Sequence, residues 1–251
     1  MHTARATRRT APASPVSTPL LAVMDGVDAA FTLAGVRVRA LAEGALWIDR
    51  TATLVVSDLH LEKGSAYAAK GQFLPPYDTR ATLRRLAALI AARRPRQVVS
   101  LGDSFHDIGG PDRMAAEDRA ALAALIAQTA DWVWIEGNHD PALPPSVGGR
   151  CAATLQIEAL TLQHEPDCAI GTVAGHLHPC AKVAARGRAV RARCFATDGA
   201  RLVMPAFGAF TGGLNVCDAA FAPMFPDGLS ALILGRARVH PAAFARLLPD
   251  S

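Results

Sequence analysis

Acidic residues, histidines and one asparagine gather in five short clusters, and each cluster directly follows an apolar run. An apolar run that ends in polar residues is typical of a short buried strand followed by a loop. Sites in α/β sheets are built at the carboxyl ends of such strands, and Asp, Asn and His are ligands for divalent metals of intermediate hardness. The pattern therefore predicts a two-metal site. The five clusters are Ser57-Asp58-Leu59-His60-Leu61, Gly102-Asp103, Gly137-Asn138-His139-Asp140, His164 and Gly175-His176-Leu177-His178.

Each cluster also has an ordinary interpretation when it is taken alone. Asp58 and His60 would be a turn aspartate beside a surface histidine. Gly102-Asp103 would be a common turn, and His164 a hydrogen-bonded, partly buried histidine. The metal interpretation is favoured because all five clusters lie, in order, at predicted strand ends, and because a glycine before the aspartate lets the backbone come close to an ion.

Predicted strands and helices alternate around the first three clusters. Residues 78–94 carry apolar side chains at i, i+3, i+4 and i+7, which predicts an amphipathic helix with Asp78 as its N-cap. A second helix is expected at about residues 113–129. Strands and helices that alternate in this way form a βαβ layout, which predicts a partly parallel sheet covered by helices. The predicted buried strands are residues 53–56, 97–101 and 132–135.

Further short strands are predicted on both sides of this unit. Between residues 30 and 48, alternating segments separated by Gly35 and Gly44 predict an antiparallel meander. After Pro141, β-like segments dominate, so we expect a second, mostly antiparallel sheet stacked on the first. The predicted fold class is α/β, a two-sheet β-sandwich flanked by helices, with the metal loops along one rim. The segments of the second sheet are residues 154–157, 160–164, 170–174, 193–196, 202–204 and 232–234.

The composition of the chain limits its organisation. A length of 251 residues with 51% hydrophobic content supports one large core, so we expect a single domain at residues 21–251. Residues 1–20 are rich in Arg, Thr, Ala, Ser and Pro and contain no acidic residue. We interpret them as a disordered basic tail; a targeting peptide or an arm that grips nucleic acid is the alternative.

Charge and cysteine usage add weaker constraints. The net charge of +4 is compatible with a polyanionic substrate. The five cysteines are odd in number and form no CxxC motif, which disfavours a disulfide framework and favours a reducing cytoplasm. No apolar run approaches 18 residues, so no membrane association is expected.

Taken together, the five clusters resemble the motif series of the calcineurin-like metallophosphoesterases over about residues 54–178. The fourth motif departs from the family pattern, because Gln163 stands where the family usually has glycine. The resemblance implies an α/β sandwich and two divalent metal ions. It places Asp58, His60 and His178 on one ion and Asn138, His164 and His176 on the other, with Asp103 bridging.

The resemblance also implies catalytic roles. His139 matches the histidine that stabilises or protonates the leaving alkoxide, and Asp140 beside it is expected to orient its imidazole through a hydrogen bond. A carboxylate can bridge two cations, and ions about 3.5–4 Å apart clamp a phosphoryl group and lower the pKa of a bridging water. The resulting hydroxide would attack phosphorus in line. Mixed Asp, Asn and His ligation suits Mn²⁺, which we expect, and also Fe or Zn²⁺.

A narrower resemblance rests on four strings that include residues outside the ligand set. They are similar to the bacterial ligase-associated DNA-damage-response endonucleases (PdeM-like phosphoesterases), a subgroup grouped with a DNA ligase, a helicase and a nuclease. Glu62 is a departure, because the subgroup more often has glycine there. This resemblance implies DNA or another phosphodiester as substrate and an association with that repair system. The strings are SDLHLEKG at 57–64, GQFLP at 71–75, LGDSFHD at 101–107 and LVMPAFGAFTGGL at 202–214.

Three residues are predicted to contact the substrate. Lys63 follows the first ligand loop and would meet a phosphate oxygen, or it would be a solvated lysine. Thr211 and Gly212 would belong to a backbone-amide cradle beside the metals, or to a flexible loop. The arginines at 186, 188, 191 and 193 would track a DNA backbone, or would protect an edge strand from aggregation.

The function that this sequence predicts is a metal-dependent phosphodiesterase, a DNA endonuclease or processing phosphoesterase of bacterial repair. A hydrolase of nucleotides, cyclic nucleotides or nucleotide-sugar pyrophosphates is the first alternative, and a long capping insertion would favour it. The only candidate insertions, residues 64–77 and 213–226, are short. A metal-binding scaffold for repair proteins is the non-enzymatic alternative, and a basic nucleic-acid-binding module is disfavoured by 6% aromatic content. The pattern does not select an oligomeric state.

Overall fold

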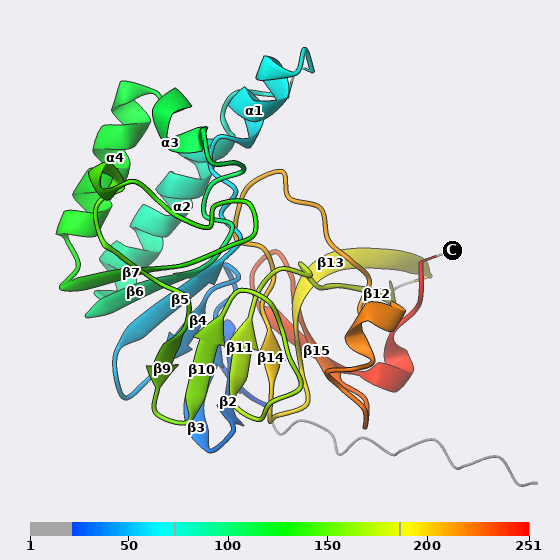
Figure 1. Cartoon of the computed structure of the whole chain (residues 1–251). Coiled ribbons are helices and arrows are strands. Elements are labelled where there is room, and N and C mark those ends of the chain that lie inside the picture. Colours follow the sequence, from blue (N-terminus) through cyan, green and yellow to red (C-terminus); the bar gives the residue numbers. More distant parts are fainter. Residues whose placement is uncertain (1–21, 73, 186, 251) are drawn as a thin grey trace, which may run out of the picture.

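Two β-sheets pack face to face, and helices cover the outer face of the first sheet (Figure 1). A computed structural model describes residues 22–72, 74–185 and 187–250 of the chain. The predicted basic tail, residues 1–20, lies outside the described residues. The expected fold class, a two-sheet α/β sandwich flanked by helices, is confirmed.

The first sheet joins an antiparallel meander to a parallel unit. Its strands are ordered as they occur in the chain, antiparallel from β1 to β5 and parallel from β5 to β8. The predicted meander and the three predicted buried strands are confirmed; β8 was missed, because it follows Pro141 and yet joins the first sheet. The strands are β1 (Val23–Asp25), β2 (Asp28–Leu33), β3 (Val36–Ala40), β4 (Leu46–Ile48), β5 (Thr53–Ser57), β6 (Gln97–Leu101), β7 (Asp131–Ile135) and β8 (Arg150–Ala152).

Four helices pack on the outside of this sheet (Figure 1). They are α1 (Lys63–Ala69), α2 (Asp78–Arg93), α3 (Gly110–Arg113) and α4 (Ala116–Ala127). The predicted N-cap of α2 is wrong: Tyr77 takes that position, and the Asp78 carboxylate instead accepts a hydrogen bond from the Gly64 amide at 3.1 Å. The second predicted helix is interrupted, because Met114 and Ala115 have extended ψ angles of 130° and 145° while Met114 buries its side chain in the core.

The second sheet has the order β16-β15-β13-β14-β11-β10-β9, with β12 paired to β13. Only β10–β11 and β11–β14 pair in parallel among the described residues, so the expectation of a mostly antiparallel sheet is confirmed. Its strands are β9 (Leu155–Ile157), β10 (Leu160–Gln163), β11 (Thr172–Ala174), β12 (Cys180–Ala185), β13 (Arg188–Thr197), β14 (Leu202–Val203), β15 (Ser230–Leu234) and β16 (Val239–Ala243). Short 3₁₀ helices are η1 (Pro145–Val147), η2 (Ala219–Phe221) and η3 (Phe244–Arg246).

The burial of the parallel strands explains why the polar clusters follow their carboxyl ends. All five residues of β5 are buried, whereas β3 alternates between buried and more exposed positions. A strand buried on both faces is typical of a parallel unit with helices on one side and a second layer on the other. Its carboxyl end must then open into a loop at the edge of the sheet. No described helix is both long and apolar enough to cross a membrane.

Candidate active site

The seven predicted metal ligands converge from both sheets. The first sheet supplies four of them from the loops after its parallel strands, and the second sheet supplies three. They are Asp58 and His60 after β5, Asp103 after β6, Asn138 after β7, His164 after β10, and His176 and His178 after β11.

The first group consists of Asp58, His60 and His178, whose ligand atoms lie within 4.8 Å of one another. The Nε2 atoms of His60 and His178 are 3.3 Å apart, and Nε2 of His178 is 3.1 Å from Oδ1 of Asp58. Two ring nitrogens and a carboxylate oxygen at these distances direct their lone pairs into one small volume. A divalent cation in that volume would satisfy all three.

The second group consists of Asn138, His164 and His176. Oδ1 of Asn138 lies 2.8 Å from Nε2 of His164 and 3.1 Å from Nδ1 of His176, and those two ring nitrogens are 3.2 Å apart. This group has the same chemistry as the first, with two imidazoles and one oxygen donor. It therefore also fits a divalent cation of intermediate hardness.

Asp103 lies between the two groups. Its Oδ1 is 3.4 Å from Nε2 of His164, and its Oδ2 is 3.9 Å from Nε2 of His60. One carboxylate thus turns a different oxygen toward each group, which is the arrangement that a bridging ligand requires.

The pKa values of the two histidines in the first group are shifted in opposite directions. Burial is the main cause that lowers the pKa of His60, to about 3, so this imidazole is neutral near pH 7. Burial also opposes ionisation of Asp58, but hydrogen bonds and positive charge from His178, together with the Ser57 hydroxyl, hold the pKa of this carboxyl below its ordinary value. Burial also opposes a charge on His178, but the hydrogen bond to Asp58 and the negative charge of that carboxylate raise the pKa of this ring above its ordinary value. Neutral imidazole and ionised carboxylate are the forms that bind metals, so an ion binding here would release the proton from His178.

Backbone strain is concentrated at these ligands. Positive φ angles cost energy in residues other than glycine, and they persist where surrounding structure enforces them, often at functional sites. Five of the predicted ligands have φ between 44° and 68°. They are Asp58, His60, Asp103, His176 and His178.

Two glycines allow the ligand loops to approach each other. A Cβ on Gly102, whose φ is 67°, would lie 2.4 Å from Nδ1 of His164. A Cβ on Gly175 would lie 2.4 Å from Oδ2 of Asp58. Neither position has room for a side chain, as the motif pattern predicted for Gly102.

His139 lies beside the bridging carboxylate. Its Nε2 is 3.9 Å from Oδ2 of Asp103, and its side chain is 42% exposed. The expected orienting bond from Asp140 is wrong: Nδ1 of His139 pairs with the backbone carbonyl of His106 at 2.9 Å. Asp140 turns away and accepts from the Phe105 amide at 3.0 Å, so it supports the loop that carries Asp103. Burial, assisted by the negative charge of Asp103, raises the pKa of Asp140 to about 7.

His106 is a residue that the motif pattern did not select. Its ring stacks on His139 with a centroid distance of 5.5 Å and meets His60 edge-on at 5.6 Å. Its buried Nδ1 has no hydrogen-bond partner among the described residues. The signal that would have found it is its place three residues after Asp103, in a string already noted for the subgroup resemblance.

Residues 206–213, which we call the rim loop, run beside the first group. The amide of Phe207 donates to the Ser57 carbonyl at 2.7 Å, and that of Gly208 donates to the Asp58 carbonyl at 3.1 Å. At the end of the loop, the Gly213 backbone lies against the His178 carbonyl with no room for a Cβ, and the next amide, of Leu214, donates to that carbonyl at 3.2 Å. The predicted substrate residue Gly212, which precedes Gly213, therefore lies near a predicted ligand.

Four cationic side chains hold the carbonyl groups of this loop. Arg193 donates to Ala206, Arg85 to Phe207, Lys63 to Phe210 and Arg191 to Gly213. The distances for Arg193, Lys63 and Arg191 are 2.6, 3.1 and 2.6 Å.

These contacts bear on the earlier interpretations of the basic residues. Arg191 and Arg193 each donate to a backbone carbonyl of the rim loop, so both have a structural contact, and a contact with a DNA backbone stays a prediction. Arg186 lies outside the described residues. The hydroxyl of Thr211 donates to the Gly208 carbonyl at 2.9 Å, so it closes the loop on itself. Substrate contacts by Lys63, Thr211 and Gly212 stay predictions.

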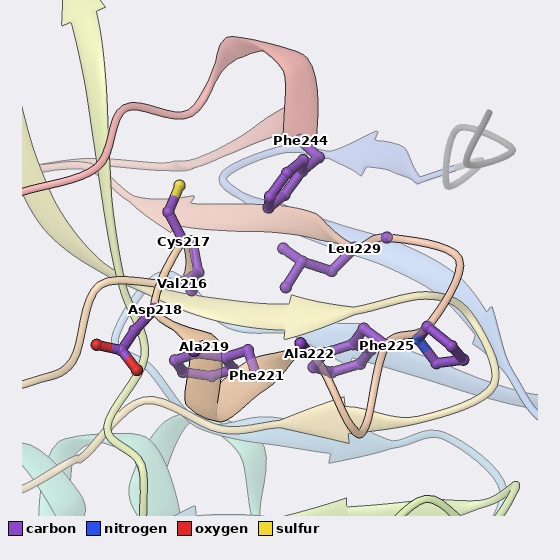
Figure 2. A pocket seen from close by; sticks show the side chains of 11 residues that line it. Val216, Cys217, Asp218, Ala219, Phe221, Ala222, Phe225, Leu229 and Phe244 are labelled. Carbon is purple, nitrogen blue, oxygen red and sulfur yellow. The ribbon is translucent and has the colours of Figure 1, made fainter. Parts of the chain in front are cut away.

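One surface depression adjoins the candidate site, and an apolar cavity lies away from it. An open depression of about 340 Å³ adjoins the second group and includes Asn138 and His164 in its lining. An apolar cavity of about 320 Å³ lies elsewhere, and Figure 2 shows Phe221, Leu229 and Phe244 around it. None of the predicted metal ligands lines this apolar cavity, so it is not part of the candidate active site.

Comparisons with known proteins agree with this geometry. Residues 51–183 match the protein family described as calcineurin-like phosphoesterase. The chain is similar to the crystal structure of Pseudomonas putida nuclease MPE, with 27% identity and a TM-score of 0.65, over 86% of this chain and 100% of that one. Yfce, a phosphoesterase from E. coli, matches with 17% identity and a TM-score of 0.36, over 76% of this chain and 98% of that one. No curated protein matches the sequence.

Proposed function

The chain belongs to the calcineurin-like phosphoesterase family, and from this premise we propose that it is a two-metal phosphodiesterase that cleaves DNA. The matched region, residues 51–183, contains all seven predicted ligands and His139. The chain is a metal-dependent phosphoesterase; the number of ions, the residue roles and the DNA substrate are our proposals.

The observation that carries the proposal is the position of Asp103 between two groups of ligands. Each group has two imidazoles and one side-chain oxygen of its own, and Asp103 turns one oxygen toward each. We assign Asp58, His60 and His178 to one ion and Asn138, His164 and His176 to the other. Manganese is the metal we propose, because mixed Asp, Asn and His donors suit it.

The proposed roles of the protein groups follow from where they lie. Divalent ions in such a site act as Lewis acids and lower the pKa of bound water. His139, beside Asp103 and partly open to solvent, is placed to hold or donate a proton at the leaving oxygen. The carbonyl of His106 fixes its Nδ1, and Nε2 is thereby directed toward the site. Asp140 acts by supporting the Asp103 loop.

Three observations support DNA as the substrate class. The similar solved structure is a nuclease, and its whole length is covered by this chain. His139 is exposed enough for a long substrate to reach it. The net charge of +4 favours a polyanion. The subgroup strings, which lie partly on the rim loop, further suggest work within a repair system that contains a DNA ligase, a helicase and a nuclease.

The experiment that tests this function compares wild type with His139→Ala after metal removal and reloading with Mn²⁺. The substrates are bis-p-nitrophenyl phosphate and supercoiled plasmid. We expect Mn²⁺-dependent cleavage of both, and a loss of about 10²–10⁴-fold in the variant at unchanged metal content. His240→Ala is the matched control, because His240 is an exposed histidine on the edge strand β16.

Each result decides between candidate functions. Cleavage of the small diester with intact plasmid would replace DNA by a nucleotide-sized substrate. Absence of turnover with both metals bound would contradict the phosphodiesterase proposal. An equal loss in His139→Ala and His240→Ala would remove His139 from the mechanism.

A further inference from the structure

An exposed aromatic side chain stands on the rim loop next to the predicted metal ligands. Phe210 is 55% exposed, although burying its ring would be favourable. Two residues before it, the Gly208 amide donates to the Asp58 carbonyl at 3.1 Å; three residues after it, the Gly213 backbone lies against the His178 carbonyl. Phe210 is therefore carried between two contacts with the first group of ligands.

The backbone at Phe210 is strained in the same way as the ligands. Its φ is 57°, and a bulky residue with positive φ is uncommon. Such strain persists where the surroundings enforce it, and it is frequent at ligand-binding positions. The surroundings here are specific: Lys63 donates to the Phe210 carbonyl at 3.1 Å, and Arg85 and Arg191 hold the loop on either side.

Lys63, which holds the Phe210 carbonyl, also borders a series of rings that ends at His139. Nζ of Lys63 lies 6.0 Å from the ring centroid of Tyr67, which is 5.6 Å from that of His106, which in turn stacks on His139. A cation and a row of aromatic rings therefore border the site on the side of α1. Cationic groups that meet phosphates, combined with rings on which bases stack, are the chemistry with which proteins bind unpaired nucleotides.

We propose that Phe210 stacks on a nucleobase next to the scissile phosphate, and that it makes the enzyme prefer diesters that carry bases over the bare sugar-phosphate chain. This inference rests on the proposed function. It goes further because it names a specificity-determining residue and the part of the substrate that this residue contacts.

The test compares two oligonucleotides of equal length and charge. One is a twelve-residue thymidine strand, and the other has the same backbone with a base-free tetrahydrofuran unit at each position. The measured quantity is the ratio of kcat/KM for the two strands in Mn²⁺-loaded wild type, Phe210→Ala and Phe210→Trp. Base–aromatic stacking corresponds to a preference of about 5- to 150-fold. We expect wild type and Phe210→Trp to show it, and Phe210→Ala to lose most of it.

The matched control is Phe244→Ala. Among the described residues, Phe244 is the other exposed phenylalanine, at 42%, and it borders the apolar cavity of Figure 2. This variant is expected to keep the wild-type ratio. Metal content and thermal midpoint are measured for each variant, so that a damaged site is recognised.

The outcomes separate this inference from the proposed function. If wild type hydrolyses no diester at all, the proposed function fails. If it hydrolyses bis-p-nitrophenyl phosphate and cleaves both strands equally, the stacking role is overturned while the proposed function stands. If it cleaves neither strand, the stacking role and the DNA substrate are both overturned, and only the phosphodiesterase activity stands. A fall in Phe210→Ala that is equal for both strands also overturns it, because Phe210 would then only support the loop.

Discussion

The ligand groups and the rim loop lie side by side and are both strained, but they are held by different means. The ligands sit at the ends of buried strands and face one another, with Asp58 and Asp103 almost fully buried. The rim loop is held through its carbonyls by side chains from α1, α2 and β13, and it exposes Phe210. The sheets thus fix the predicted ligands, whereas side-chain contacts fix the rim loop, which is the proposed substrate surface.

The electrostatics of the two regions also differ. The ligand region holds carboxylates and imidazoles that cations can bind. The rim loop is held by arginine and lysine side chains, and the charge of one of them is costly to bury. Burial lowers the pKa of Arg85 to about 10, and its Nε has no hydrogen-bond partner among the described residues. Arg85 is still protonated near pH 7. A buried charge without a carboxylate partner is tolerated where its hydrogen bonds to backbone are needed.

The largest expected effect is in the ligand region. Asp103→Ala removes the group that contacts both halves of the site, and metal ions contribute several kcal/mol to catalysis. We expect kcat/KM to fall by about 10³-fold or more, together with weaker metal binding measured by calorimetry. Asp118→Ala is the control, since Asp118 pairs with Arg80 on the helical layer. Activity within tenfold of wild type would show that the two groups act without a bridging residue.

Gly102→Ala, compared with Gly35→Ala, separates the effect of backbone strain from the effect of a steric contact with a predicted ligand. A left-handed backbone costs an alanine about 1–2 kcal/mol, and the new Cβ also meets the His164 ring. We expect metal affinity to fall about 10- to 100-fold. Gly35→Ala has the same kind of strain, with φ 84°, but no atom within 4 Å of its Cβ. It should lose stability in thermal unfolding without losing metal; equal metal loss in both variants would contradict the steric explanation.

Arg85→Met tests the rim loop directly. It removes the donor to the Phe207 carbonyl and the stacking of the guanidinium at 4.4 Å from the Phe207 ring. A misplaced substrate surface should lower kcat/KM on DNA about tenfold, and the unpaired carbonyl should cost about 1–3 kcal/mol in denaturant unfolding. Metal content should not change. Arg84→Met, an exposed neighbour on α2, is the control; a loss of metal in Arg85→Met alone would mean that the two regions are one unit.

Lys63→Met has the smallest expected effect. If Lys63 meets a phosphate oxygen while it holds Phe210, its loss should raise KM for DNA about two- to fivefold at 0.1 M salt and leave kcat nearly unchanged. The difference should shrink in higher salt. Lys70→Met removes an exposed charge at the other end of the same helix and serves as control. A decrease confined to kcat would assign Lys63 to the reacting groups instead.

The sequence was sufficient for the features that depend on local pattern. The parallel strands β5, β6 and β7 and the polar residues after them could be predicted. A strand buried on both faces is a continuous apolar run, and the loop that follows it is polar, so both features are visible within about ten residues of sequence. The ligand Asp103 and the glycine before it follow from that pattern. The break between α3 and α4 could not be predicted. Met114 ends α3 and buries its side chain in the core between the sheet and the helices, and this contact has no signal in the local sequence.

Contacts between distant residues account for the other differences. Asp78 and Asp140 were expected to serve their neighbours in the chain, yet their carboxylates bind amides 14 and 35 residues away. The contact of Arg85 with Phe207 spans 122 positions and has no local signature. The roles of the rim loop therefore became visible only when both sheets were in place.

The joining of two sheets at one site has a consequence for how the protein matures. His60 and His178 face each other across 118 positions of the chain, so an ion held by both would close a ring of nearly half the polypeptide. An ion that binds only the assembled fold would stabilise it against the unfolded chain. During synthesis His60 emerges 118 residues before His178. The first group of ligands would therefore be complete only after the second sheet has docked on the first, and an ion bound there would then stabilise the completed fold.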